Sequence, residues 1–419
     1  MTSGVSRIDR ALFVTRSFPA DLEKATYGIY TRMRLFLDAL AAIADTIDIL
    51  FYVNPEIALT SSDLSKLQDG IHTKWKINSA VTASRLAPLN GSGFWSSYLA
   101  PALTISCQKG YGELCHKHQL TAFEECLNRK PKLVFIHRLP CMLPPLLSTR
   151  PSPALFFDLD GIDHDALIRS IRQPPRWRSK FLHYLQVPAL MRTERRAIRL
   201  ARRTFVCSEK DRDYLVHSLG LERVSVVPNA VSIPLEQYSL PASPSFLFMG
   251  TYSYQPNVNA VEWMMKDIWP IIKKKLPNAK MIIAGNKPEM IPSFSRQPPG
   301  VEFTGFVQNV EELYRVARVV CCPLLEGTGT RVKIVEASSR GKAIVSTSIG
   351  AEGLQFLDGK EILIRNNAHD FADACIALAM NDDLCSDLGK SARAAAKRRF
   401  DRQQIIADVV KTLGCSHDR

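Results

Sequence analysis

The chain has 419 residues, of which 46% are apolar and 23% are charged, and its formal net charge is +13. This length exceeds the size at which one hydrophobic core keeps growing, so two domains of roughly 200 residues each are expected. The ordinary composition excludes extensive disorder, and no apolar run in the sequence is long enough to cross a bilayer.

The cysteines and the N-terminal residues both favour a reduced, cytoplasmic setting. None of the ten cysteines forms a C-x-x-C pair, and the group Cys107, Cys115, His116 and His118 matches no structural zinc spacing. The first ten residues, MTSGVSRIDR, lack the apolar stretch of a secretory signal. We therefore expect no signal peptide, no transmembrane helix, no metal and no cofactor.

Short apolar runs alternate with helical patterns along the first half of the chain, which is typical of strand, helix, strand units around a parallel sheet. A loop and a helix that begins at Gly28 follow the first run. The expected strands are Arg10 to Thr15, Thr46 to Val53, Leu133 to His137, Leu155 to Asp158, Thr204 to Cys207 and Val224 to Val227.

A segment with two prolines and two serines, Leu235 to Pro244, predicts a boundary between domains 1–237 and 238–419. In the second domain, strands are expected at Phe246 to Met249, Met281 to Ala284, Val301 to Thr304, Val319 to Pro323 and Ala343 to Thr347. Helices are expected at Asn259 to Leu276 and Val310 to Ala317, from Thr330, Asp370 and Leu384, and at Gln403 to Leu413.

The last helix could cross back to the first domain. This order of elements predicts an α/β protein with two doubly wound, Rossmann-like domains, and it places ligands at the carboxyl ends of the strands, in a cleft between the domains.

A glycine-rich loop follows the expected strand Val319 to Pro323 and leads into a helix. It contains Gly327, Thr328, Gly329 and Thr330. Glycines let the backbone approach an anion, and the free amides of the first helical turn point at it. Val332 stands where the third glycine of a dinucleotide fingerprint belongs, and no Walker lysine pattern is present. The loop therefore indicates phosphate binding outside the dehydrogenase and P-loop classes.

Charged residues follow this loop. Arg331 and Lys333 could hold a leaving diphosphate through charge-assisted hydrogen bonds, each contributing about 1.5–3 kcal/mol. Glu336 follows Lys333 by three residues, so on a regular helix its carboxylate could accept both hydroxyls of a ribose. The same spacing is compatible with a solvated helix face that carries an ion pair.

From Phe248 onward the chain resembles the retaining glycosyltransferases of family 4, in a bacterial branch. The stretches FMGTYSYQPN, PLLEGTGTRVKIVEA and VSTSIGAEGL carry the resemblance, in the order and spacing of the family pattern. The stretches FVCSEKDRDYL and VVPNAV extend it more weakly upstream. The resemblance implies a GT-B architecture, a nucleotide-sugar donor held mainly by the second domain, an acceptor held mainly by the first, and no required metal.

The family pattern also implies roles for single residues of the second domain. Glu336 resembles the ribose-binding glutamate, and Phe306 and Val307, which follow Gly305, resemble the segment that meets the nucleobase. Glu326 resembles the first glutamate of the family pair, but it lies two residues further from Glu336 than is usual in the family.

The loop after the first strand of the second domain departs from the family pattern. Many relatives carry an Arg and Lys pair there, whereas Gly250 to Val261 contains no basic residue. We infer that Arg331 and Lys333 neutralise the donor diphosphate instead and act catalytically, with Gly250 part of the donor site.

In the first domain, His137 ends an expected central strand, where family members often place a histidine near the donor sugar. A structural role is open as well, and His164 is a second candidate. Gly28, with Arg32 one turn later, resembles the loop that approaches the diphosphate, although a helix start with a surface arginine fits too. We interpret Asp158, Asp160, Asp163 and Asp165 as a hydrated acidic loop that could contact acceptor hydroxyls.

The positive charge is concentrated between Arg169 and Arg203, where eleven Arg or Lys residues face one acid. Six arginines are expected on one face of an amphipathic helix: Arg192, Arg195, Arg196, Arg199, Arg202 and Arg203. With Trp177 and Phe181 beside them, they could bind an anionic bilayer, since each basic side chain gains about 1 kcal/mol there. An ordinary solvated face is the alternative, and nucleic acid is disfavoured because no aromatic residues are interleaved with the charges.

These patterns predict a cytoplasmic glycosyltransferase, peripheral at the inner face of the membrane. It would move a sugar from a nucleotide donor to a carbohydrate or lipid-linked acceptor in a polysaccharide, lipopolysaccharide or glycolipid pathway. Two alternatives stay open: another GT-B enzyme, such as a nucleotide-sugar epimerase, and a catalytically silent sugar-nucleotide-binding protein, which the displaced Glu326 would suit.

Overall fold

The computed structural model describes residues 7–16, 28–57, 59–89, 93–172, 178–236, 238–327 and 329–414. The chain forms two compact units, residues 1–228 together with 403–419, and residues 229–402. The first unit thus ends at Pro228, before the sequence-based boundary after residue 237. The helix α16 (Arg402–Gly414) groups with the first unit from Gln403 onward.

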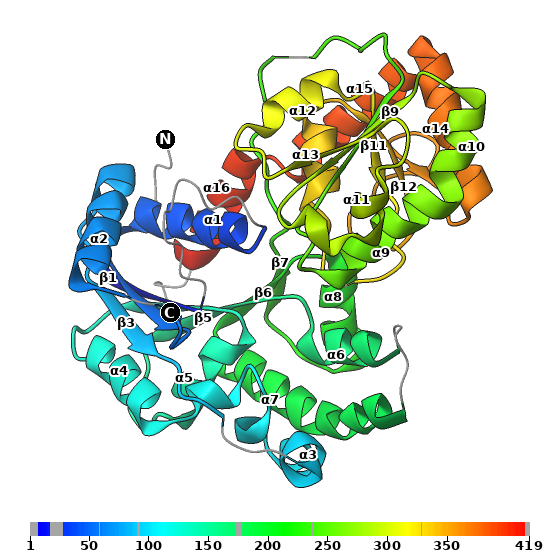
Figure 1. Cartoon of the computed structure of the whole chain (residues 1–419). Coiled ribbons are helices and arrows are strands. Elements are labelled where there is room, and N and C mark those ends of the chain that lie inside the picture. The colour runs from blue at the N-terminus through cyan, green and yellow to red at the C-terminus, as the bar shows by residue number, and fades with distance from the viewer. Residues whose placement is uncertain are drawn as a thin grey trace. The chain divides into compact units, whose positions relative to one another are not determined.

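The first unit is a parallel sheet with helices on both faces, α1 on one and α4, α5 and α7 on the other (Figure 1). Its described strands have the order β3-β2-β1-β4-β5-β6-β7. They are β1 (Ile8–Thr15), β2 (Ala44–Val53), β3 (Val81–Arg85), β4 (Leu133–His137), β5 (Ala154–Asp160), β6 (Arg203–Val206) and β7 (Val224–Val226). The helices are α1 (Gly28–Ile43), α2 (Ser61–Trp75), α3 (Ala100–Leu103), α4 (Lys117–Leu127), α5 (Leu143–Leu147), α6 (Asp163–Arg172), α7 (Val187–Leu200) and α8 (Glu209–Asp213).

The central strands of this sheet are buried on both faces, which explains their continuous apolar sequences. Helix α1 packs on the sheet through Phe36, whose ring centroid lies 4.6 Å from that of Phe135 on β4 and 5.6 Å from that of Phe205 on β6. Aromatic contacts of this kind add to the burial of apolar area. Helix α1 is therefore fixed over the middle of the sheet.

The second unit is also a parallel sheet between helices, with the strand order β10-β9-β8-β11-β12-β13. Its strands are β8 (Ser245–Met249), β9 (Lys280–Ala284), β10 (Val301–Gly305), β11 (Val319–Cys322), β12 (Ala343–Ser346) and β13 (Leu363–Ile364). Its helices are α9 (Gln255–Trp263), α10 (Trp269–Lys275), α11 (Pro292–Arg296), α12 (Val310–Val316), α13 (Val332–Ser339), α14 (Ala368–Met380) and α15 (Asp382–Arg399). The prediction of two doubly wound α/β units is confirmed.

Some elements differ from the sequence prediction. The edge strands β3 and β13 were missed because β3 is mostly half-buried and β13 has only two residues. The expected single helix Asn259 to Leu276 is interrupted by a π-helical turn, Met264–Ile268. Pro270 explains the interruption, because its ring clashes with the carbonyl four residues earlier and it has no N–H to donate.

The order of strands reverses once in each sheet, between β1 and β4 in the first unit and between β8 and β11 in the second. In doubly wound sheets, ligands bind beyond the carboxyl ends of the strands at such a reversal. These two positions are therefore where functional residues are sought. Within the described ranges, no helix is both long enough and apolar enough to span a membrane.

Candidate active site

The loops after β8 and β11 lie against each other at the strand reversal of the second unit. A Cβ atom at Gly250, after β8, would lie 2.8 Å from the side chain of Asn257 on α9. Gly327, after β11, has φ 114°, and a Cβ atom there would lie 3.0 Å from the hydroxyl of Tyr254. At Gly250 a side chain would press on the helix that follows β8, whereas at Gly327 it would press on the β8 loop from the β11 loop.

Hydrogen bonds join the glycine loop to its neighbours. Asn259 on α9 donates to Glu326 Oε1 over 2.5 Å, so the carboxylate of Glu326 is held by the helix after β8. Asn229 donates to the Thr330 hydroxyl over 2.7 Å. Glu326 is buried, and its role at a donor sugar stays a prediction.

Lys333, in the first turn of α13, contacts neutral groups. Its ammonium donates to Asn257 Oδ1 over 2.9 Å and lies 4.2 Å from the ring centroid of Phe248. Burial lowers the pKa of Lys333 from its ordinary value to about 8. A buried cation with a lowered pKa is stabilised in its charged form by an anion close by.

Arg331 lies at the N-cap of α13 and is buried; its guanidinium donates to the carbonyl of Gly329. The positive charge of Arg331 contributes to the lowered pKa of Lys333, so the two cations are neighbours. The interpretation of this stretch as an ordinary solvated face does not fit, because Arg331 is buried and Lys333 is half-buried. The structure brings together the two cations and the glycines, while a diphosphate role stays a prediction.

Other predicted donor residues lie on the same unit. Glu336 is half-buried on α13, and burial raises its pKa. Gly305 ends β10 with φ 68°, after which Phe306 is exposed and Val307 is half-buried. Thr328 lies outside the described residues. The ribose and nucleobase roles of these residues stay predictions.

Tyr254, Asn257 and Asn259 were not predicted as site residues, but they lie against Gly327, Lys333 and Glu326, respectively. A signal for them was present, since Pro256 and Asn257 end the stretch FMGTYSYQPN. Pro256 lies in the first turn of α9, where proline is favoured, and so fixes the start of the helix that carries both asparagines.

In the first unit, Arg32 and Asp158 form a buried ion pair. Arg32 is 3% exposed, and its guanidinium donates to Asp158 over 2.6–3.0 Å and to the carbonyl of Val227 over 2.7 Å. The interpretations of Arg32 as a surface residue and of Asp158 as part of a hydrated loop are therefore wrong. Gly28 begins α1, four residues before Arg32.

His137 is fully buried at the end of β4. Its Nδ1 lies 2.9 Å from the hydroxyl of Thr15 at the end of β1, across the strand reversal. Burial, Arg138 and Arg32 lower its pKa well below the ordinary range, so the ring is neutral. Contact with a sugar would require the covering side chains to move, and the active-site role of His137 stays a prediction.

Two neighbouring strand ends of the first unit carry strained backbone. Arg138, after β4, has φ 74°, and Asp160, at the end of β5, has φ 64°. Their side chains approach to 3.6 Å. Positive φ at residues other than glycine costs energy and gathers at functional sites, so this edge of the sheet is the second candidate region.

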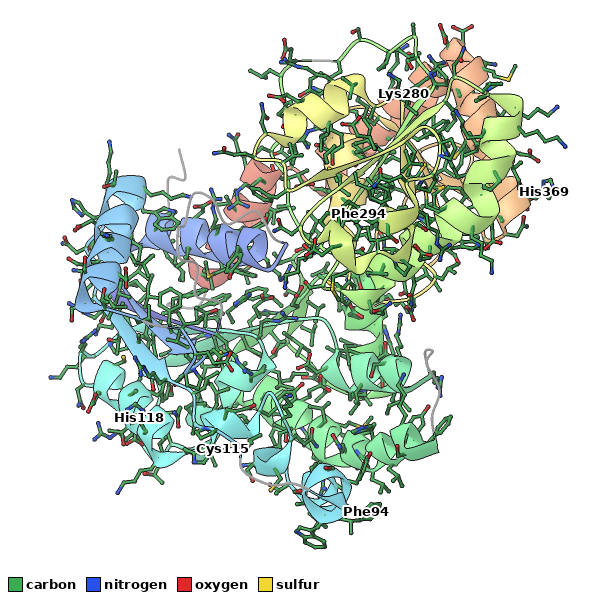
Figure 2. The ribbon with its side chains drawn as sticks, in the orientation of Figure 1. Phe94, Cys115, His118, Lys280, Phe294 and His369 are labelled. Atoms are coloured by element: carbon green, nitrogen blue, oxygen red, sulfur yellow. The ribbon has the colours of Figure 1, made fainter. Side chains whose placement is uncertain are left out.

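No metal-binding group is found in the parts of the chain that the structure describes. Cys115 and His118, labelled in Figure 2, belong to the cysteine and histidine group noted in the sequence. His118 Nδ1 lies 3.1 Å from the hydroxyl of Ser84.

Residues 243–381 match the family model described as Glycosyl transferases group 1. The matched residues lie within the second unit, which is therefore similar to the group 1 glycosyltransferases. An uncharacterised 44.6 kDa protein from the cps region of Klebsiella pneumoniae is 25% identical over 174 residues, 39% of this chain and 45% of that protein. A phosphatidyl-myo-inositol mannosyltransferase of Mycobacterium leprae is 25% identical over 222 residues, 49% of this chain and 56% of that protein. The chain thus spans about half the length of these curated relatives.

Solved structures resemble the chain over nearly its whole length. Sucrose-phosphate synthase from Thermosynechococcus elongatus is 14% identical with a TM-score of 0.67, covering 97% of this chain and 98% of that one. Anabaena HepE with UDP and glucose is 15% identical with a TM-score of 0.61, covering 97% of this chain and 100% of that one. Staphylococcus aureus TarM with UDP is 10% identical with a TM-score of 0.66, covering 96% and 99%. At these identities the likeness shows the fold alone, and the predicted GT-B fold is confirmed.

Replacing Arg32 by Met leaves Asp158 buried without its cation. We expect the free energy of unfolding to fall by about 3–5 kcal/mol. In the double variant Arg32→Met/Asp158→Leu stability should lie closer to wild type, because no buried charge is left unpaired. Urea unfolding measures both, with Arg34→Met on the same helix as control. A single variant within about 1 kcal/mol of wild type would contradict the importance of the pair.

The lowered pKa of Lys333 predicts pH-dependent binding of nucleoside diphosphates. Lys333 is mostly charged at pH 7 and mostly neutral at pH 9, because its pKa is about 8. If only the charged form binds, the Kd for the tightest-binding of UDP, GDP and ADP should rise about tenfold between pH 7 and pH 9. Calorimetric titrations measure this rise.

Two lysine variants make this pH test specific. Lys333→Arg should bind without the rise, because arginine stays charged. Lys342 also has a pKa lowered to about 8 by burial, but it donates to the carbonyl of Ala317. Lys342→Arg should therefore keep the rise. A wild-type Kd that is constant over this range would exclude Lys333 as the diphosphate cation.

Proposed function

We propose that the chain is a retaining, nucleotide-sugar-dependent glycosyltransferase. It moves a sugar from a nucleoside diphosphate donor to a hydroxyl group of a carbohydrate or lipid-linked acceptor. The pathway is the synthesis of a polysaccharide, lipopolysaccharide or glycolipid. No metal or cofactor is required in this proposal.

The observation that carries the proposal is the half-buried cation Lys333 beside the glycine loop at the strand reversal. Its contacts are the neutral Asn257 and the ring of Phe248, and Arg331 is a second cation close by. A diphosphate would offset the repulsion between the two cations and accept hydrogen bonds from the first amides of α13. Phosphate binding at this point of a doubly wound unit is the arrangement that a nucleotide-sugar donor needs.

In the proposed reaction, the acceptor oxygen forms a bond to the anomeric carbon while the bond from that carbon to the diphosphate breaks. The acceptor proton passes to the leaving phosphate oxygen, so atoms and charges balance. Arg331, Lys333 and the loop amides stabilise the negative charge that develops on the leaving group.

The related proteins support the substrate classes. HepE is described in complex with UDP and glucose, and TarM with UDP. The Mycobacterium relative is named a phosphatidyl-myo-inositol mannosyltransferase, and the Klebsiella relative lies in a cps region. A nucleotide-sugar donor and a lipid-linked or polysaccharide acceptor are therefore the substrates to test first.

Release of nucleotide from a panel of UDP, GDP and ADP sugars tests the proposed function. Lys333→Ala and Arg331→Ala should each lower kcat/KM by roughly 10- to 100-fold, because each removes a charge-assisted hydrogen bond to phosphate. Lys280→Ala, at the exposed start of β9 (Figure 2), serves as the control and should keep wild-type turnover.

The products separate the alternatives. Conversion of the donor to another nucleotide sugar without an acceptor would indicate an epimerase. Nucleotide binding without release from any donor would indicate a silent binding protein. Variants of Lys333 and Arg331 that turn over donor like wild type would show that other groups neutralise the diphosphate.

We also propose that the first unit binds the inner face of the membrane. On α7, Arg192, Arg196 and Arg199 are exposed, and Phe181 and Leu185 are exposed on the preceding 3₁₀ segment Arg178–Gln186. The sequence placed six arginines on one helix face, but Arg202 follows the end of α7 and Arg203 begins β6, because buried Ala201 has an extended backbone. Trp177 lies outside the described residues.

Co-sedimentation with vesicles of phosphatidylcholine and phosphatidylserine tests membrane binding. The variant Arg192→Glu/Arg196→Glu reverses two exposed charges. It should lower the partition coefficient for these vesicles at 0.1 M salt by at least about tenfold. The matched double variant Lys274→Glu/Lys275→Glu on α10 should bind like wild type. Equal loss in both, or no loss in either, would exclude α7 as the membrane-binding face.

A further inference from the structure

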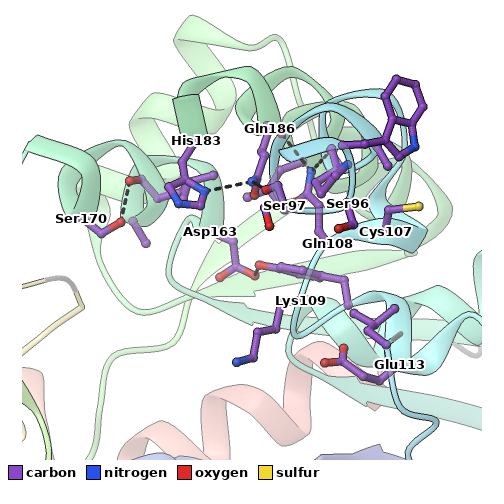
Figure 3. A pocket seen from close by; sticks show the side chains of 18 residues that line it. Ser96, Ser97, Cys107, Gln108, Lys109, Glu113, Asp163, Ser170, His183 and Gln186 are labelled. Atoms are coloured by element: carbon purple, nitrogen blue, oxygen red, sulfur yellow. Dashed lines mark hydrogen bonds between the residues drawn. The ribbon is translucent and has the colours of Figure 1, made fainter. Parts of the chain in front are cut away.

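A cavity of about 960 Å³ lies within the first unit (Figure 3). Its walls come from the π-helical turn Trp95–Leu99, from α3, from residues 107–113, and from α6 and α7. This volume is at the upper end of the range for small-molecule sites. The proposed donor site in the second unit does not use it.

Carboxyl groups lie on one side of the cavity. Asp163, the first residue of α6, accepts a hydrogen bond from the Tyr111 hydroxyl over 2.8 Å. Glu113 Oε1 accepts from the backbone N–H of Gly110 over 3.0 Å, whereas Oε2 is buried and, among the described residues, has no hydrogen-bond partner. A buried carboxylate oxygen of this kind favours a ligand that donates a hydrogen bond.

The backbone of Asp163 is held by a buried network. The backbone N–H of Asp163 donates to Glu194 over 2.7 Å, and Glu194 also contacts His164. The other ring nitrogen of His164 lies 2.9 Å from the hydroxyl of Tyr214. Burial, and to a smaller extent the negative charge of Glu194, raises the pKa of Asp163 to about 7. Near neutral pH this carboxyl can both accept and donate a hydrogen bond, as a hydroxyl-rich ligand requires.

Apolar groups form other parts of the wall and continue onto the surface. The apolar residues of the lining are Leu89, Trp95, Pro101, Leu167 and Leu190. Although Trp95 lines the cavity, its side chain is 62% exposed. We use the term apolar rim for the exposed side chains of Phe94, Trp95, Leu103, Phe181 and Leu185. Figure 2 shows Phe94 at the outside of the unit.

Most of the apolar rim lies on or beside two segments, Trp95–Leu99 and Arg178–Gln186, and these segments contact each other at the cavity. The rings of Tyr98 and His183 are 5.0 Å apart, and Gln186 donates to the carbonyl of Ser97 over 3.1 Å. His183 and Gln186 also line the cavity. The rim therefore adjoins the cavity through Trp95 and through these two segments.

These groups select among ligand classes. An anion is disfavoured because Lys109 is the single Lys or Arg among the described lining residues, whereas Glu113 and Asp163 supply two carboxyls (Figure 3). A sugar ring fits, because its hydroxyls can bond to carboxylates and its C–H face can pack on an indole. A hydrocarbon chain attached to that sugar would cover the exposed rim.

We propose that this cavity binds the sugar of an amphipathic glycosyl acceptor, with Asp163 and Glu113 bonded to its hydroxyls and its hydrocarbon chain on the apolar rim. The inference rests on the proposed function, because it names the acceptor of that reaction.

Binding of n-octyl glycosides tests this inference without donor or turnover. The probes are the octyl and methyl glycosides of glucose, galactose, mannose and N-acetylglucosamine, and tetraethylene glycol monooctyl ether as a probe with the same chain and no sugar. Ligand-observed NMR below the micelle concentration measures their affinities. At least one octyl glycoside should bind about tenfold more tightly than both its methyl counterpart and the ether.

Two variants with matched controls locate the binding. Leu167→Trp should narrow the cavity beside Asp163 and weaken glycoside binding, whereas Leu200→Trp, on the exposed end of α7, should not. Asp163→Asn should weaken binding about tenfold, whereas Asp165→Asn, outside the cavity lining, should not. Circular dichroism confirms that each variant is folded.

The proposal is overturned if no octyl glycoside binds to the wild type, if the sugar-free ether binds as tightly as the glycosides, or if both Leu167→Trp and Asp163→Asn bind as tightly as the wild type. A failure of nucleotide release would instead refute the proposed function. The binding experiment would still test the cavity in that case, because glycoside binding does not require catalysis.

Discussion

The close meeting of two loops at the reversal between β8 and β11 is the constraint on which the candidate donor site depends. Parallel strands bring the loops after β8 and β11 to one edge of the sheet, and the lack of a side chain at Gly327 lets the β11 loop approach Tyr254 of the β8 loop. Only in that geometry can Asn257 reach Lys333. The lowered pKa of Lys333 is thus a consequence of backbone packing, since burial between the loops removes water from its ammonium.

A second case of buried charge organises the first unit. Arg32 on α1 reaches Asp158 at the end of β5 and so ties a helix to the strand ends that the sheet reversal brings together. Such a pair gives little net stability compared with apolar packing, but losing one partner is costly. Its position beside neutral His137 and the strained Arg138 and Asp160 is typical of an edge where geometry is kept for function.

The sequence predicted the central strands well because both faces of each are buried, which forces continuous apolar runs such as β1 and β4. It also predicted the glycine loop and its cations, which lie within one short stretch of chain. It could not predict the Arg32–Asp158 pair, whose partners are 126 residues apart and become neighbours only through strand order. The contacts of Asn257 and Asn259 were missed for the same reason, since they depend on which loops meet.

The cation pair beside the glycine loop and the carboxyls of the cavity differ in sign, and this difference limits the ligands that each can bind. Arg331 and Lys333 in the second unit would repel a cation and favour a diphosphate, whereas Asp163 and Glu113 in the first would repel a phosphate and favour hydroxyl donors. Such a difference suits the proposed transfer, in which the leaving group is anionic and the acceptor is a neutral alcohol. If both proposed sites carried cations, free nucleotide would compete for the acceptor position. In the proposed acceptor cavity the carboxyls would therefore contribute to specificity by disfavouring the donor diphosphate.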